Sequence, residues 1–187
     1  MSINFFDENK KTNSSKNQFG LCDDPPPAEN PAYIDETNKN KWIGIVNNST
    51  KKDTCFFPID HCVPLFRPKL TKVKNPVIRI IHKFLILLFK IQEKESSCDG
   101  VLSYNNNLIF VELKNRGSGG WLKKGREQLT VTIAKFKENH DIQKYNKVEA
   151  YVCNSLKPLA NTGNSNHIQQ FKDETGLILN VQQNIDI

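Results

Sequence analysis

The chain has 187 residues, enough for one domain with a single core or for one domain and a loose tail. Hydrophobic residues make up 37 % and charged residues 25 %, proportions typical of an ordinary globular protein. Lys and Arg outnumber Asp and Glu by 26 to 20, giving a formal charge of +6. This excess favours polyanionic partners such as nucleic acid, although charge alone does not identify one.

The sequence argues against a disulfide-rich or zinc-binding protein, against a protein with a signal peptide and against a membrane-spanning protein. The five cysteines have irregular spacing and no CxxC pair, which argues against a disulfide framework and against a structural zinc site. The first residues lack the basic and apolar regions of a signal peptide. The most apolar stretch, Val77–Ile91, is short for a bilayer and is interrupted by four basic residues. We therefore expect a reduced, cytoplasmic protein without a membrane partner.

Residues 1–40 are rich in Asn, Lys, Asp and Ser and contain three consecutive prolines, so an extended or poorly ordered arm is expected there. Residues 41–187 are expected to form one α/β domain. Short strands are predicted at Trp42–Val46 and Cys55–Ile59, and the three prolines within His61–Pro76 predict irregular structure.

From Val77 to Ile91 apolar residues recur at helical spacing opposite a basic stripe, which predicts an amphipathic helix, with a pair of strands as the alternative. A hairpin follows, because three consecutive asparagines separate two strand-like segments. The predicted elements from this point are strands Asp99–Tyr104 and Leu108–Lys114, helix Trp121–Lys137, strand Lys147–Asn154, helix Asn164–Thr175 and strand Leu177–Val181. This order predicts a mixed central sheet flanked by helices.

The second strand of the predicted hairpin carries a carboxylate and an ammonium on one face. Side chains alternate along a strand, so Glu112 and Lys114 project together, opposite the apolar face of Val111 and Leu113. Asp99 opens the partner strand and comes level with this end when the hairpin closes. Two carboxylates beside a lysine suit Mg²⁺, which takes oxygen ligands and phosphate, and they predict metal-assisted phosphodiester hydrolysis.

The pattern Asp99 … Glu112-Leu113-Lys114 resembles the D-x(n)-E-x-K signature of the PD-(D/E)XK nuclease superfamily, over about residues 76–182. The following helix, with Gln128, is similar to a family helix in which a glutamine supports the active site. The sequence departs from the family in having Cys98 before the aspartate and no glutamate in the first predicted helix, so Glu93 and Glu95 are only loose candidates for a further acidic residue.

The resemblance implies a restriction endonuclease-like sandwich and a cytoplasmic endonuclease that cleaves DNA with Mg²⁺ or Mn²⁺, in restriction, defence or repair. Asp99 and Glu112 would bind the metal together with the backbone carbonyl of Leu113, and Lys114 would position or activate water. Catalysis would thus rest on Asp99, Glu112, Lys114 and Gln128, and DNA contacts on Arg116, Lys123, Lys124 and Arg126.

Two alternatives stay open at this level. Glu112 and Lys114 are also consistent with an ordinary solvated strand face, where opposite charges contribute little. The fold is also consistent with a catalytically inactive module that binds nucleic acid or a protein partner, for example in a toxin–immunity, defence or mobile-element system. Double-strand cleavage needs two active sites, so a homodimer is one assembly to be considered.

Overall fold

The computed structural model describes residues 3–28, 30–68, 80, 92–117, 119–157 and 165–187. Its elements are β1 (Thr12–Ser14), β2 (Gln18–Cys22), β3 (Tyr33–Asp35), η1 (Lys39–Lys41), β4 (Gly44–Asn47), β5 (Thr54–Pro58), β6 (Phe66–Pro68), β7 (Gln92–Lys94), β8 (Gly100–Tyr104), β9 (Asn107–Lys114), α2 (Trp121–Asn139), η2 (Ile142–Lys144), β10 (Lys147–Asn154), α3 (Ser165–Thr175), β11 (Leu179–Val181) and β12 (Asn184–Asp186). The fold is α/β with a mixed central sheet.

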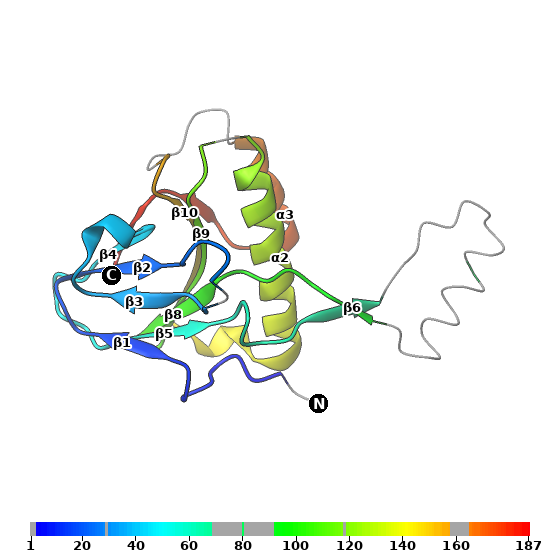
Figure 1. The fold of residues 1–187 in the computed structure, drawn as a ribbon. Helices are drawn as coiled ribbons and strands as arrows, with labels where there is room; N and C mark the ends of the chain where they lie inside the picture. The colour runs from blue at the N-terminus through cyan, green and yellow to red at the C-terminus, as the bar shows by residue number, and fades with distance from the viewer. Residues whose placement is uncertain (1–2, 29, 69–79, 81–91, 118, 158–164) are drawn as a thin grey trace.

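The central sheet has six strands in the order β1-β5-β8-β9-β10-β11. The strands from β1 to β9 pair antiparallel, whereas β9, β10 and β11 are parallel to one another. Helices α2 and α3 make the connections between the parallel strands and lie together on one side of the sheet (Figure 1). A second sheet, β12-β4-β2-β3, packs on the opposite face, and β6 and β7 form a separate two-stranded antiparallel sheet that projects from the body.

Both faces of the central sheet are therefore buried. On the helix side, Phe110 of β9 contacts the ring of Phe136 in α2, with ring centroids 5.2 Å apart. On the other side, Ile109 and Val111 pack with Phe19 of the second sheet. Because β9 is covered twice, its residues from 108 to 113 are all buried, including one charged residue.

The hairpin, the two helices and the parallel strand that the sequence predicts are present. Strand β10 has the predicted bounds, and α2 extends two residues beyond its predicted end. The hairpin turns at Asn105 and Asn106, whose φ values of 44° and 59° are ones that asparagine tolerates better than most residues. Gly176, with φ 75°, follows the end of α3 as a helix-terminating glycine does.

The N-terminal segment differs from the arm expected for residues 1–40. Three strands form within it, and the side chains of Phe5, Phe19 and Leu21 are fully buried. Phe5 packs against the end of α2, and the other two contribute to the core under the second sheet. A few large apolar residues, well spaced, are enough to attach a polar segment to an existing domain.

Two further expectations concern residues 61–91. The predicted helix Val77–Ile91 lies outside the described residues except for Ile80. Within His61–Pro76, expected to be irregular, Phe66–Pro68 forms strand β6 and pairs with β7. Among the helices that the structure describes, none combines the length and apolar character needed to cross a bilayer.

Gly20 provides a test of how the second sheet is packed. A Cβ atom at this position would lie 2.0 Å from two atoms of the Trp42 ring, so replacing Gly20 with alanine must displace the indole. We expect a loss of about 1–3 kcal/mol in the free energy of unfolding, measured by urea denaturation. The control is Gly117→Ala, where a Cβ would meet no atom within 4 Å; equal stabilities of the two variants would contradict this packing.

Candidate active site

The hairpin brings Asp99 level with Glu112. Gly100 pairs with Val111 in the antiparallel ladder, so the residue before one and the residue after the other are neighbours across the strands. Asp99 is only 7 % exposed and Glu112 is fully buried. The carboxylate of Asp99 accepts a hydrogen bond of 2.5 Å from the backbone N–H of Leu113, which fixes it beside the glutamate.

Helix α2 covers this pair of carboxyl groups. Gly125 of the helix lies directly over β9 and β10, so that a Cβ atom there would be 3.2 Å from Cγ of Glu112 and 3.1 Å from Val152. A larger residue would hold the helix further from the sheet. The close approach explains how a charged side chain in the middle of the structure is removed from solvent.

Lys114 and Gln128 complete the arrangement at the end of β9. The ammonium of Lys114 forms an ion pair and hydrogen bond with Oε1 of Glu112, and it donates at 3.1 Å to Oε1 of Gln128. The amide nitrogen of Gln128 in turn donates at 2.7 Å to the backbone carbonyl of Ser97. Gln128 thus connects the lysine to the segment that leads into Asp99, and all four predicted catalytic residues lie together.

The electrostatics of the site are dominated by burial. Burial raises the pKa of Asp99 to about 7, although Lys114 and the N–H of Leu113 oppose the rise. Burial, followed by the charge of Asp99, also raises the pKa of Glu112 well above its usual value. Burial lowers the pKa of Lys114, but the two carboxylates outweigh this effect and the net shift is upward. The site therefore carries more negative than positive charge when its carboxyl groups are ionised.

Sequence reasoning did not identify two further carboxylates near this site, Asp23 and Asp60. Their charges add to the rise in the pKa of Asp99. Asp23 follows β2 of the second sheet, and Asp60 follows Ile59, whose N–H donates at 2.9 Å to the carbonyl of Asp99. Each stands just after a strand, which is a position where polar residues gather at a sheet edge, but the sequence does not reveal which strand ends meet.

Glu93 and Glu95, the loose candidates for an additional acidic residue, take part in other contacts. Glu93 accepts a hydrogen bond of 2.7 Å from Arg67, and Glu95 lies 3.7 Å from the same guanidinium. Neither is among the charges that perturb Asp99 or Glu112. Both glutamates thus interact with Arg67 of β6 rather than with the candidate site.

The four predicted DNA-contact residues separate into two groups. Arg116, Lys123 and Lys124 are exposed beside the end of β9 and the start of α2. Arg126 is instead 5 % exposed, with Nη1 3.6 Å from a carboxylate oxygen of Glu174 in α3. The structure does not support a phosphate contact by Arg126, because its guanidinium lies between two helices.

The residues present fit a hard divalent cation. Oε2 of Glu112 is buried and has no hydrogen-bond partner among the described residues, which is costly for a carboxylate oxygen unless a cation approaches. Within the described ranges no three His, Cys, Asp or Glu side chains are grouped to hold a metal. Mg²⁺ is commonly held by only one or two carboxylates with water and phosphate, so Asp99 and Glu112 suffice in number.

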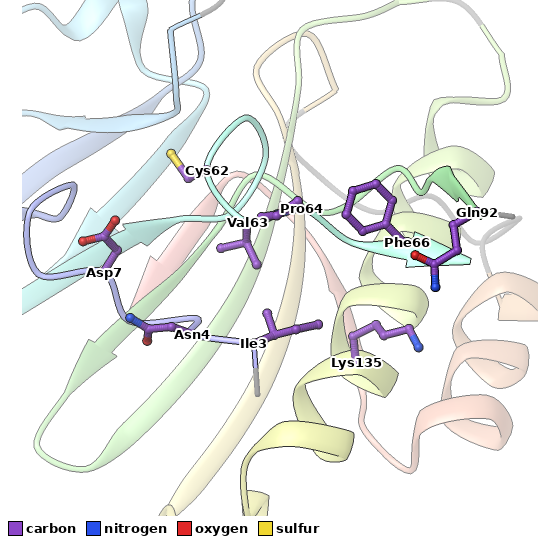
Figure 2. Close-up of a pocket in the computed structure, with 9 residues that line it drawn as sticks. All are labelled: Ile3, Asn4, Asp7, Cys62, Val63, Pro64, Phe66, Gln92 and Lys135. Atoms are coloured by element: carbon purple, nitrogen blue, oxygen red, sulfur yellow. The ribbon is translucent and has the colours of Figure 1, made fainter. Parts of the chain in front are cut away.

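A cavity of about 690 Å³ has none of the predicted catalytic residues in its lining (Figure 2). Its walls come from the N-terminal segment, the loop after β5, strands β6 and β7, and α2. Its lining residues are Ile3, Asn4, Asp7, Cys62, Val63, Pro64, Phe66, Gln92 and Lys135. Size alone would favour it as a binding site. The cluster at the end of β9 is the better candidate. Its buried carboxylates and ion-paired lysine supply chemistry that this cavity lacks.

No family model, no curated protein and no solved structure matches the chain. A function is therefore inferred from the geometry of the site and not from a relative.

Proposed function

We propose that this protein is a divalent-metal-dependent nuclease of the PD-(D/E)XK type that hydrolyses phosphodiester bonds in DNA. The observation that carries the proposal is the buried cluster at the end of β9. It holds two carboxylates and one ammonium, and one oxygen of Glu112 has no partner among the described residues. A solvated strand face would not bury these groups, so the plain surface interpretation is less suitable.

In this proposal each residue of the cluster has a separate task. Asp99 and Glu112 would hold Mg²⁺ or Mn²⁺, helped by the carbonyl of Leu113. A bound cation of this kind supplies charge stabilisation at phosphate and lowers the pKa of a coordinated water. Lys114 would orient the attacking water and offset charge on the phosphate, while Gln128 keeps the ammonium in place.

The architecture is consistent with a restriction endonuclease-like core. An antiparallel hairpin carries the acidic residues, α2 crosses over its end, and β10 returns parallel to β9. This is the succession of elements that the sequence resemblance implies. In this chain a second sheet, formed mainly by β2, β3 and β4, covers the face of the central sheet opposite the helices.

The surroundings of the site favour a polyanionic substrate. Arg116, Lys123 and Lys124 lie exposed next to the end of β9, and the whole chain carries a formal charge of +6. Basic side chains of this kind bind phosphates irrespective of base sequence and make affinity fall with salt. The free cysteines agree with action in a reducing compartment such as the cytoplasm.

Metal binding tests the proposal directly. Titration of the full chain with Mn²⁺ in a calorimeter is expected to show binding that Glu112→Ala weakens more than about a hundredfold, since a ligand carboxylate is removed. The matched control is Glu93→Ala, which removes a half-buried carboxylate paired with Arg67 and should leave the binding intact.

Circular dichroism shows whether the Glu112→Ala chain remains folded, so that a loss of binding can be assigned to the ligand. Cleavage of plasmid DNA with Mn²⁺ is followed in parallel. If the folded wild-type chain neither binds Mn²⁺ nor cleaves DNA, the nuclease assignment fails. A catalytically inactive module that binds nucleic acid or a protein partner would then explain the fold better.

A further inference from the structure

A small cavity adjoins Lys114 on the side of the glycine-rich loop. Its volume is about 140 Å³, and its lining residues are Lys114, Arg116, Gly119, Gly120, Trp121 and Lys124. Three of these side chains are basic and none is acidic. The cavity thus lies beside the cluster of carboxylates and differs from it in the sign of its charge.

The size of the cavity limits what it accepts. Pockets for drug-sized molecules are roughly 300–1,000 Å³. This cavity is smaller, so a small anionic group such as a phosphate suits it better than a drug-sized ligand.

The charges of the lining residues indicate which phosphate would fit. Lys114 is already paired with Glu112. Arg116 and Lys124 also line the cavity, and neither takes part in an ion pair within the described part of the chain. A phosphomonoester carries a charge of about −1.5 to −2 at neutral pH, whereas an internal phosphodiester carries a single negative charge. The doubly charged group is the closer match.

We propose that this cavity binds the terminal phosphomonoester of a nucleic-acid strand, beside the site that would cleave it. Arg116 offers the planar, forked donors that suit phosphate oxygens, and Lys124 supplies a second charge. Trp121 is also among the lining residues, and an indole offers an apolar surface to an adjacent nucleotide. The identity of the polymer as a substrate rests on the proposed nuclease function, but the phosphate site itself does not.

Binding without metal tests the inference. Short fluorescent oligothymidylates with a 5′-phosphate, a 3′-phosphate or neither are titrated with the full chain in EDTA, and anisotropy gives the affinity. One of the two phosphates is expected to strengthen binding about tenfold, because two charge-assisted contacts are added. Lys124→Ala should lower that gain, because it removes one of the two contacts. Comparison of the 5′-phosphorylated and 3′-phosphorylated oligonucleotides shows which end of the strand the cavity binds.

Lys123→Ala is the matched control, since it removes the same charge from the neighbouring, exposed position, which does not line the cavity. It should weaken all three oligonucleotides alike and preserve the gain. The inference is overturned if no terminal phosphate improves binding to the wild type, or if the two lysine variants behave identically. Because EDTA removes divalent metal, a failure of the nuclease proposal leaves this result unaffected.

Discussion

Asp99→Asn is expected to make the metal-free protein more stable at pH 8 and to reduce DNA cleavage by about a hundredfold or more. The two effects have one cause, because the carboxylate that would bind the metal is buried at a cost to folding. Asparagine keeps an oxygen that can accept the hydrogen bond from the N–H of Leu113, and it removes the charge. Stability would then be gained where function is lost.

The pH dependence gives the sign of this effect. In the unfolded chain the carboxyl releases its proton near its ordinary pKa of 3.8, whereas in the folded chain burial raises that pKa to about 7. Between these values the folded state binds more protons, so the stability contributed by this group falls as the pH rises. At pH 8 the variant should gain on the order of 2–4 kcal/mol, and at pH 3 almost none.

Thermal unfolding in EDTA at several pH values measures the difference. Asp173→Asn, an exposed replacement of the same kind on α3, should follow the wild-type profile. A destabilised Asp99→Asn variant at pH 8 would mean that the carboxylate is held favourably by its surroundings. The interpretation that burial of this carboxylate costs stability in the absence of a cation would then be wrong.

The hairpin, and the meeting of its two carboxylates, could be predicted because each signal is local. Alternation along Leu108–Lys114 fixes which residues share a face, and the asparagines fix where the chain turns. These two facts set the register that places Asp99 beside Glu112. The spacing of the motif therefore contained the site's main geometry, although it could not show that Glu112 is completely buried.

The second sheet could not be predicted in the same way. Its strands are short, and β12 pairs in parallel with β4 although the two are separated by most of the chain. Strand β2 includes Gly20, a residue that weakens a strand in isolation but here makes room for the Trp42 ring. Long-range pairing of weak strands depends on the central sheet that they cover, and no local pattern encodes it.

The burial of Arg126 could have been predicted from its spacing in the sequence. It lies four residues after Leu122 and three before Leu129, both of which are buried on the inner face of α2. Helical spacing thus placed it among core residues, while its charge suggested a surface role. By contrast, the proximity of Asp23 and Asp60 to the site depends on where separate strands end in space, which spacing does not determine.

Lys114→Met is expected to lower the free energy of unfolding by about 3–5 kcal/mol at pH 8, because it leaves Glu112 in a buried position without its counter-charge. Methionine retains much of the length of the lysine stem, so lost packing contributes little. The carboxylate can escape by taking up a proton, and the loss should therefore shrink as the pH falls toward 5.

The double variant Glu112→Gln/Lys114→Met separates the charge from the shape of the site. With both charges removed, most of the stability lost in Lys114→Met should return at pH 8, and the pH dependence should weaken. Urea denaturation of the wild type, both single variants and the double variant at pH 5 and pH 8 gives the interaction energy. A loss in Lys114→Met that is equal at both pH values, and is not recovered in the double variant, would show that the lysine acts through packing. In that case Lys114 would not balance the charge of Glu112, and the end of β9 would lack the charged centre that a metal-dependent nuclease needs.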